Sequence, residues 1–254
     1  MLLLHDRDQI EQCLTKDPIL HLYELGDLDL LYWPRTTWYA SDDLSALLLV
    51  YAAFPPALLA MSSSPQAREL LAQALPQLPR AFHAQISADL VEVLRGGYHL
   101  ENQVTTLRMA LADPNCLPEE DPEVQILGPE RVLEIQDFYD ESYPDNWFDP
   151  AMLVTERYLG VRVEGRLACV AGIHVWSPRY RVAALGNIAT HPDFRGQGLA
   201  RRVVGTLCRR LLPEVDQIGL NVRASNAPAI RCYRALGFEL KASFQELDAR
   251  ATSD

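Results

Sequence analysis

The sequence has 254 residues, of which 48% are hydrophobic and 22% charged, a composition typical of a folded globular protein rather than a disordered chain. All of the formal charge of -11 lies in the first half, because residues 1–125 hold 7 basic and 18 acidic side chains, whereas residues 126–254 hold 16 of each. This distribution disfavours nucleic acid and anionic membranes as partners, since both need a positive surface potential.

The N-terminal apolar stretch, MLLL, is too short for a signal peptide or a membrane span, so we expect a cytoplasmic protein. The sequence has an odd number of cysteines and no C-x-x-C pair, which argues against a disulfide framework or a zinc site. We therefore expect no metal. The thiols should be reduced and mostly buried; they are Cys13, Cys116, Cys169, Cys208 and Cys232.

The first half shows a mixed α/β pattern. Residues 45–54 are almost continuously apolar and predict a buried strand. Residues 64–75 predict a helix that has Ser64 as its N-cap and a proline in its first turn. This half shares no motif with the second half, although both predict a helix, strands, a helix and a strand. A duplicated fold that has diverged is one explanation.

Residues 111–127 combine three prolines with five acidic residues between two patterned regions, which is typical of an interdomain linker. We place the boundary near residue 122. The expected domains are therefore residues 1–122 and 123–254.

The second half has a sharper pattern. Residues 129–141 predict a helix, and an aromatic loop leads from it into three β-rich runs. Short turns join these runs, so they should form an antiparallel meander. The predicted strands of the meander are 157–163, 166–176 and 182–190. The elements expected after them are a helix over about 198–212, a strand over 217–223, a helix over about 226–236 and a strand over 238–247.

Two glycines stand where the segment HPDFRGQGLARRVV, residues 191–204, passes from a turn into an amphipathic helix. Gly196 and Gly198 permit positive φ and leave the backbone amides uncovered. The first four N–H groups of a helix have no intrahelical acceptor, so this helix start is suited to an anion, and Arg195 and Arg201 add positive charge. A plain turn that joins strand to helix is the alternative.

Two familiar phosphate-binding loops are excluded. The dinucleotide-binding fingerprint needs a third glycine where Arg201 stands, and the nucleoside-triphosphate loop needs a Gly-Lys-Ser/Thr sequence that the chain lacks. The sequence therefore indicates neither NAD nor ATP.

Two motifs in register carry a resemblance to a known family. Arg195-x-x-Gly198-x-Ala200 resembles the Arg/Gln-x-x-Gly-x-Gly/Ala motif of the GCN5-related N-acetyltransferase (GNAT) family, in which loop amides hold the coenzyme A pyrophosphate. Residues 225–240 resemble the family's Asn-x-x-Ala-x-x-x-Tyr-x-x-x-Gly-Phe segment. The matching residues there are Asn226, Ala229, Tyr233, Gly237 and Phe238. With the strand order included, the resemblance covers roughly residues 126–248.

The resemblance implies the α/β GNAT fold, a mixed and mostly antiparallel sheet flanked by helices, in residues 123–254. A second, diverged GNAT-like α/β domain would precede it. The implied activity is acetyl transfer from acetyl-CoA to a primary amine, of a small molecule or a peptide, by direct attack on the thioester. The alternatives are a catalytically inactive acyl-CoA-binding module and an acetyltransferase of protein N-termini.

Because the first half lacks both motifs, we do not expect it to bind a second coenzyme. Three roles stay open for it: a degenerate acetyltransferase half, a substrate-gripping domain, or a module that forms a homodimer.

The resemblance also implies roles for individual residues. Tyr233 would donate a proton to the coenzyme A sulfur, and Asn226 would contact the pantetheine arm or orient the loop. The backbone of Ile188 and Thr190 would pair with the pantetheine amides. The remaining coenzyme-binding residues would be Arg195, Gly196, Gln197, Gly198, Leu199, Ala200 and Arg201.

No general base is evident on the strand over 182–190, where many relatives carry a glutamate, and Asn187 cannot accept a proton at neutral pH. His174 on the neighbouring strand is our candidate base, because the ordinary pKa of histidine lies near neutrality; a structural histidine is the alternative. Glu156 is a weaker candidate. We expect His191, before a proline, to be a turn residue.

The aromatic loop SYPDNWFDP, residues 142–150, is the candidate wall of the amine site. Its aromatic side chains lie beside carboxylates in the sequence, which suits a cationic or amphipathic amine. A surface loop packed on the core is the alternative. The residues concerned are Tyr143, Asp145, Trp147, Phe148 and Asp149.

Overall fold

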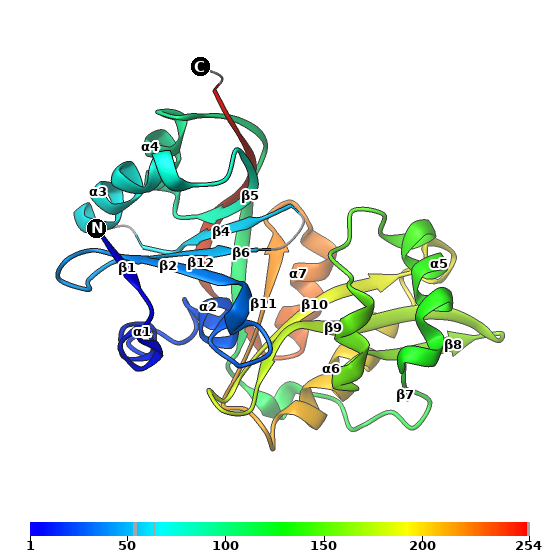
Figure 1. Cartoon of the computed structure of the whole chain (residues 1–254). Coiled ribbons are helices and arrows are strands. Elements are labelled where there is room, and N and C mark those ends of the chain that lie inside the picture. The colour runs from blue at the N-terminus through cyan, green and yellow to red at the C-terminus, as the bar shows by residue number, and fades with distance from the viewer. Residues whose placement is uncertain (53–54, 63, 253–254) are drawn as a thin grey trace. The chain divides into compact units, whose positions relative to one another are not determined.

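The structure is a computed structural model that describes residues 1–52, 55–62 and 64–252 (Figure 1). The chain forms two compact units. Unit 1 comprises Met1–Arg108, Val222–Asn226 and Lys241–Asp254, and unit 2 comprises Met109–Asn221 and Ala227–Leu240. The domains that we expect at 1–122 and 123–254 stay a prediction.

Unit 1 has the element order β-α-α-β-β-β-α-β-α-β. Its sheet has the strand order β1-β2-β3-β4-β5-β12-β6, and Figure 1 shows α3 and α4 on one side of the strands with α1 and α2 on the other. The elements are β1 (Leu2–Leu4), α1 (Arg7–Leu14), α2 (Leu22–Asp27), β2 (Thr36–Ala40), β3 (Leu47–Tyr51), β4 (Ala57–Ala60), α3 (Pro65–Ala74), β5 (Ala81–Ile86), α4 (Val91–Arg95), β6 (Tyr98–Leu111) and β12 (Phe238–Ala251).

Both elements predicted in the first half are present. The strand expected over 45–54 is β3, which begins at Leu47, and residues 53–54 lie outside the described residues. The helix expected over 64–75 is α3. Its N-cap is Ser64, whose hydroxyl accepts the Ala67 N–H at 3.1 Å.

The strand β12 completes the sheet of unit 1. It pairs antiparallel with β5, from Gln245 opposite Ile86 to Arg250 opposite Ala81. Beside it, Arg108 of β6 is fully buried, and its guanidinium lies 5.2 Å from the ring centre of Phe244 in β12. A strand from the end of the described chain therefore closes the core of the first unit.

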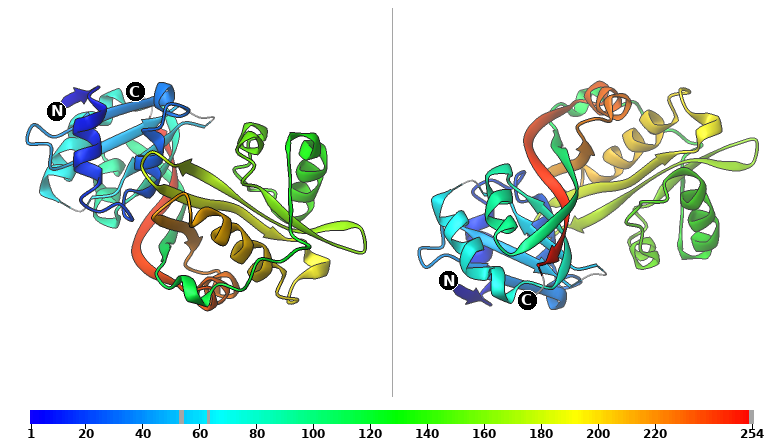
Figure 2. Two further views of the ribbon diagram at one scale, coloured as in Figure 1. Left: turned by 90° about the horizontal axis from the view of Figure 1, so that it is seen from below. Right: turned by 90° about the horizontal axis from the view of Figure 1, so that it is seen from above.

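Unit 2 repeats the first nine elements of this order, with a 3-10 helix in the place of the second helix. Figure 2 shows α5 and α6 on opposite faces of β9 and β10, and both helices contact β10. The elements are β7 (Gln125–Ile126), α5 (Val132–Ser142), the 3-10 helix η6 (Pro150–Thr155), β8 (Leu159–Val163), β9 (Arg166–Ser177), β10 (Val182–Thr190), α6 (Leu199–Leu211), β11 (Gln217–Arg223) and α7 (Ala227–Ala235).

The expected antiparallel meander is confirmed as β8, β9 and β10, and the only parallel pair in the described sheet of unit 2 is β10 with β11. The predicted helix starting near residue 198 is α6, and its apolar stripe faces the core, with Val203, Val204 and Leu207 fully buried. The fold is therefore the mixed, mostly antiparallel sheet flanked by helices that the sequence implies.

The acidic segment that we expected to be a linker packs along α6. The carbonyl groups of Leu117 and Pro118 accept hydrogen bonds from Arg209, and Asp121 accepts one from Arg202. The Asp121 N–H in turn donates to the hydroxyl of Thr206 at 3.1 Å. Ion pairs and backbone contacts thus hold this proline-rich segment on the helix surface.

Two observations concern other expectations. Among the described residues, no helix combines the length and apolarity that crossing a bilayer requires. Within the same part of the chain, no group of three His, Cys, Asp or Glu side chains is placed to hold a metal ion.

Gly237 ends α7 in the left-handed conformation, with a φ of 89°. A Cβ atom at this position would lie 2.1 Å from the Asp113 carbonyl oxygen. The Gly237 carbonyl also accepts the N–H groups of Ala112 and Asp113, at 2.9 and 3.1 Å. The glycine therefore lets the segment before β7 approach the end of α7.

We predict that Gly237→Ala destabilises the protein by clearly more than Gly165→Ala. Gly165 has a similar φ of 80°, but a Cβ atom there would meet nothing within 4 Å, so its cost should be only the roughly 1–2 kcal/mol of a left-handed alanine. Urea unfolding of both variants measures the difference. Equal losses of stability would show that the contact with Asp113 is unimportant.

Candidate active site

The site begins where two parallel strands separate. β10 pairs with β11 over four residue pairs, from Val182 opposite Gln217 to Leu185 opposite Leu220. From Gly186 to Thr190, β10 continues beside β9 only. The backbone of Ile188 and Thr190 therefore lies in the stretch of β10 that β11 no longer covers. Unpaired peptide groups on such a stretch can bind the amides of a ligand.

A bulge interrupts β10 at Asn187. Asn187 and Ile188 together lie opposite Ala171, and Asn187 adopts a left-handed φ of 52°. A bulge bends the strand and increases its twist. An asparagine tolerates the left-handed conformation better than most residues do, which suits it to this position.

A buried hydrogen-bond network holds the bulge. Asn187 is only 3% exposed; its side chain accepts the Trp147 N–H at 3.1 Å and donates to the Tyr158 hydroxyl at 2.8 Å. Its carbonyl accepts the Tyr139 hydroxyl at 2.6 Å, and Tyr158 also donates to the carbonyl of Ile173. The network joins α5, the aromatic loop, β9 and β10.

The start of α6 has the geometry that the two glycines predict. Gly196 and Gly198 have φ values of 78° and 74°, and a Cβ atom on either would meet nothing within 4 Å. Gly198 is the N-cap of α6, and no side chain of the described chain caps this end. The amides of the first turn therefore face open space, as an anion-binding helix start requires.

The arginines near this loop fall into two groups. Arg202, Arg209 and Arg210 are bound to the proline-rich segment along α6. Arg195 and Arg201 are exposed, and neither forms an ion pair within the described ranges; Arg195 donates to the carbonyl of Thr190 at 3.2 Å. Two cationic side chains beside the glycines are thus available to an anionic ligand.

Tyr233 lies on α7 and is 6% exposed, with its ring centre 6.0 Å from that of Phe238. Cys232, the residue directly before Tyr233 in α7, interacts electrostatically with Arg201 of α6: burial raises the pKa of the Cys232 thiol, and the charge of Arg201 partly offsets the rise. The helices α6 and α7 are also in contact. Asn226 directly precedes α7 but belongs to unit 1, where its N–H donates to the carbonyl of Arg223.

His174, the candidate base, is the extra residue of a second bulge, which lies in β9. On its two sides, Ile173 pairs with Leu185 of β10 and Val175 pairs with Ala184. Its ring lies against Gly186 of β10, because a Cβ atom on that glycine would come within 2.1 Å of Nε2. Burial lowers the pKa of His174 to about 4. The imidazole is therefore neutral at pH 7 and able to accept a proton, but it is a weak base.

The other candidates for proton transfer lie in structural positions. His191 is nearly buried and begins the 3-10 helix Pro192–Phe194; its Nδ1 accepts the Asp193 N–H, and its Nε2 lies 2.9 Å from Glu141 Oε2. It is the turn residue that we expected. Glu156 is exposed and ends η6 with a left-handed φ of 56°.

One part of the aromatic loop packs on the core and the other part is exposed. Phe148 packs between Tyr139 and Tyr158, with ring centres 5.4 Å from each. Asp149 caps η6 by accepting the Ala151 N–H at 2.8 Å. Trp147 is 42% exposed, and its neighbour Asp145 is also exposed. One part of the loop is anchored in the core, whereas the other presents an aromatic ring and a carboxylate to solvent.

The network around Asn187 was not predicted from the sequence. We treated this residue only as a group unable to accept a proton, and we assigned no role to Tyr139 or Tyr158. Each of the three appears in the sequence as an ordinary member of a helix or strand. Only the register of β9 against β10 reveals the bulge that connects them.

Comparison with known proteins finds a family match within the second half of the chain. Residues 125–238 match the acetyltransferase (GNAT) family. This region is a GNAT domain. Over 90 residues the chain is 40% identical to the ribosomal protein bS18-alanine N-acetyltransferase of Escherichia coli K12, an alignment that covers 33% of this chain and 56% of that protein. The chain therefore spans about half the length of this curated relative.

Two further proteins extend the comparison. The chain is 35% identical over 103 residues to the mycothiol acetyltransferase of Clavibacter michiganensis, covering 39% of this chain and 30% of that protein. A tandem GNAT protein from the clavulanic acid biosynthesis pathway has a similar fold, with a TM-score of 0.58 at 16% identity, covering 100% of this chain and 98% of that one. The GNAT-like fold therefore extends over both halves of the chain.

We predict that Asn187→Ala destabilises the GNAT domain by about 2–4 kcal/mol, because it removes the acceptor of the part-buried Trp147 N–H and one partner of the buried Tyr158 hydroxyl, and puts alanine at a positive φ. Asn102→Ala is the matched control, since Asn102 has the same φ of 52° but is exposed. Urea unfolding should show a clearly smaller loss for the control. Similar losses would mean that the network contributes nothing.

A second prediction concerns pH. The pKa of His174 is about 4 in the folded protein and about 6.5 in an unfolded chain, so the unfolded state binds more protons between these values. The wild-type protein should lose stability as the pH falls through this window, and His174→Gln should lose less. Urea unfolding at pH 7 and pH 4.5 tests this, with the exposed His99→Gln as control. Parallel losses in all three proteins would contradict the assigned pKa.

Proposed function

We propose that the chain is an N-acetyltransferase that transfers an acetyl group from acetyl-CoA to a primary amine. The observation that carries the proposal is the start of α6, where two glycines with positive φ leave the first-turn amides open beside Arg195 and Arg201. The curated relatives support it, since both are named as acetyltransferases.

The residues at this site fit coenzyme A. The amides and arginines from Arg195 to Arg201 would hold the diphosphate, because a helix start with adjacent cations binds phosphate groups well. The uncovered backbone of Ile188 and Thr190 would pair with the pantetheine arm, with Asn226 as a further contact. When bound, acetyl-CoA supplies an activated thioester carbonyl. No metal is part of the proposal.

Residues of the chain would then carry out the proton transfers of the reaction. Tyr233 would hold a proton at its hydroxyl for the departing sulfur, and its burial limits the access of water. His174 would take a proton from the amine, directly or through a water molecule. The exposed ring of Trp147 and the carboxylate of Asp145 would form part of the amine site.

The name of the Escherichia coli relative favours a peptide acceptor with an N-terminal alanine over other primary amines. We also propose that residues 123–254 carry the activity, with residues 1–122 as a diverged acetyltransferase-like domain. A binding module without catalysis is the second candidate, because burial lowers the pKa of His174 to about 4 and β10 has no carboxylate.

The coenzyme site can be tested by filling its open space. Asparagine tolerates a positive φ, so Gly196→Asn and Gly198→Asn should keep the loop conformation while placing side chains over the amides. We expect each to weaken coenzyme A binding by about tenfold or more, measured by calorimetry. Gly165→Asn, at a hairpin turn with a φ of 80°, should leave binding unchanged. Wild-type protein that gives no binding heat would refute the proposal.

Catalysis can be tested by the release of free thiol from acetyl-CoA in the presence of N-terminal peptides, polyamines, amino acids and aminoglycosides. We expect Tyr233→Phe to lower kcat by about 100-fold with little change in coenzyme affinity, because only proton donation is removed. Tyr180→Phe, in the turn between β9 and β10, is the control. Coenzyme binding without turnover of any amine would favour the binding module.

A further inference from the structure

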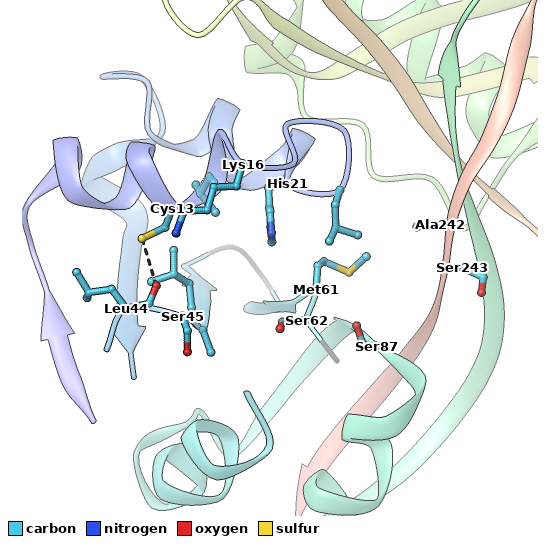
Figure 3. Close-up of a pocket in the computed structure, with 14 residues that line it drawn as sticks. Cys13, Lys16, His21, Leu44, Ser45, Met61, Ser62, Ser87, Ala242 and Ser243 are labelled. Atoms are coloured by element: carbon cyan, nitrogen blue, oxygen red, sulfur yellow. Dashed lines mark hydrogen bonds between the residues drawn. The ribbon is translucent and has the colours of Figure 1, made fainter. Parts of the chain in front are cut away.

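Unit 1 contains a cavity of about 320 Å³ (Figure 3). It lies where the parallel strands β4 and β5 end, because Met61 and Ser62 directly follow β4 and Ser87 directly follows β5. Lys16 and His21, from the connection between α1 and α2, face these residues across the cavity in Figure 3. The cavity belongs wholly to unit 1, and none of its lining residues is among those proposed for acetyl transfer.

The connection after β4 is too short to form a diphosphate site like that of unit 2. In unit 2, thirteen residues including three glycines separate the last β10–β11 pair, at Leu185, from α6 at Leu199. In unit 1, β4 pairs with β5 up to Ala60, and α3 begins at Pro65. The four intervening residues include no glycine, and the described ones, Met61, Ser62 and Ser64, lie outside any strand. The cavity is therefore suited to a small molecule rather than to a coenzyme.

The side chain of Ser87 in the cavity wall is buried, and its hydroxyl group is available to a ligand. Ser87 is 9% exposed, its N–H donates to the Ala60 carbonyl at 3.0 Å, and its carbonyl accepts the Leu90 N–H at 3.0 Å. Its hydroxyl has no partner among the described residues and points toward the cavity in Figure 3. The hydroxyl groups of Ser45 and Ser62, by contrast, donate to Asp43 and Ser64.

His21 is oriented by a buried carboxylate. Its Nδ1 lies 3.3 Å from Oε1 of Glu24, which is 3% exposed, and Glu24 Oε2 in turn lies 3.9 Å from the buried Arg108. This contact fixes the imidazole ring and leaves Nε2 as the nitrogen that can meet a ligand. In Figure 3 the free end of the ring points into the cavity.

The charge of the cavity is opposite to that of its surroundings. The first half of the chain has a large excess of acid, yet no Asp or Glu is among the residues that line the cavity. Lys16, one of only two lysines in the sequence, does line it and forms no ion pair within the described ranges. The rest of the wall is mainly apolar and includes Leu14, Leu20, Leu47 and Met61.

We propose that this cavity binds a small monocarboxylate. The carboxylate would accept hydrogen bonds from Lys16, His21 and Ser87, and a short aliphatic chain would lie against the apolar wall. One lysine and one imidazole match a single negative charge better than a phosphate dianion, which proteins usually meet with arginine forks or several amides. The volume lies at the small end for ligand pockets, which limits the ligand to about four to six carbons.

The test measures the binding of hexanoate to the full chain by calorimetry and by ligand-observed NMR. We expect saturable binding of hexanoate, with hexanamide and hexylamine bound at least about tenfold more weakly, because they lack the charge that Lys16 would meet. Lys16→Gln and Ser87→Ala should each weaken hexanoate binding by about five- to tenfold. Arg80→Gln removes a charge from an exposed position of unit 1 outside the cavity and should change nothing.

Thermal unfolding of each variant establishes that it is folded, and Lys16 is exposed, so Lys16→Gln tests the proposal even if Ser87→Ala impairs folding. The proposal is overturned if hexanoate shows no saturation up to about 10 mM, a concentration at which even millimolar affinity is detected. It is also overturned if the amide binds as well as the acid, or if Lys16→Gln binds hexanoate like the wild-type protein. None of these results depends on acetyl transfer by unit 2.

Discussion

The separation of β10 from β11 after Leu185 is the constraint on which the second unit depends. A fully paired parallel sheet would bury every peptide group of β10 and leave none for a ligand. The bulge at Asn187 breaks this regularity, and its cost is offset because the Asn187 side chain and carbonyl satisfy three neighbours in a buried network. The same network ties the aromatic loop to β10, so the proposed amine site and the proposed coenzyme site depend on the same hydrogen bonds.

The arginines around α6 fall into two groups, those that hold the proline-rich segment and those that are exposed. Three of its arginines hold the proline-rich segment, whose acidic residues account for part of the charge asymmetry of the sequence. Arg201 and the preceding Arg195 are left for a ligand. A single surface ion pair contributes little to stability. Here several ion pairs act along one helix together with hydrogen bonds to backbone carbonyls, so they position the proline-rich segment as well as stabilising it.

Most local structure could be predicted from the sequence because it depends on local signals. The strand over 182–190 and the helix near 198 follow from apolar periodicity and from the glycines between them. The bulges could not be predicted, since they depend on how β9 and β10 align. The sequence also gave no sign that burial would lower the pKa of His174, or that Arg202 and Arg209 would bind the segment expected to be a linker. These are long-range effects.

The place of β12 in the sheet of unit 1 bears on how the chain is made. Ile86 of β5 pairs with Gln245 of β12. During synthesis the edge of β5 therefore stays unpaired until nearly all of the described chain has left the ribosome. A nascent first unit with an unpaired edge is exposed to wrong pairing and aggregation, and the completion of its sheet must await the synthesis of residues 245–250. The two units are therefore coupled in biogenesis, even though each has its own core.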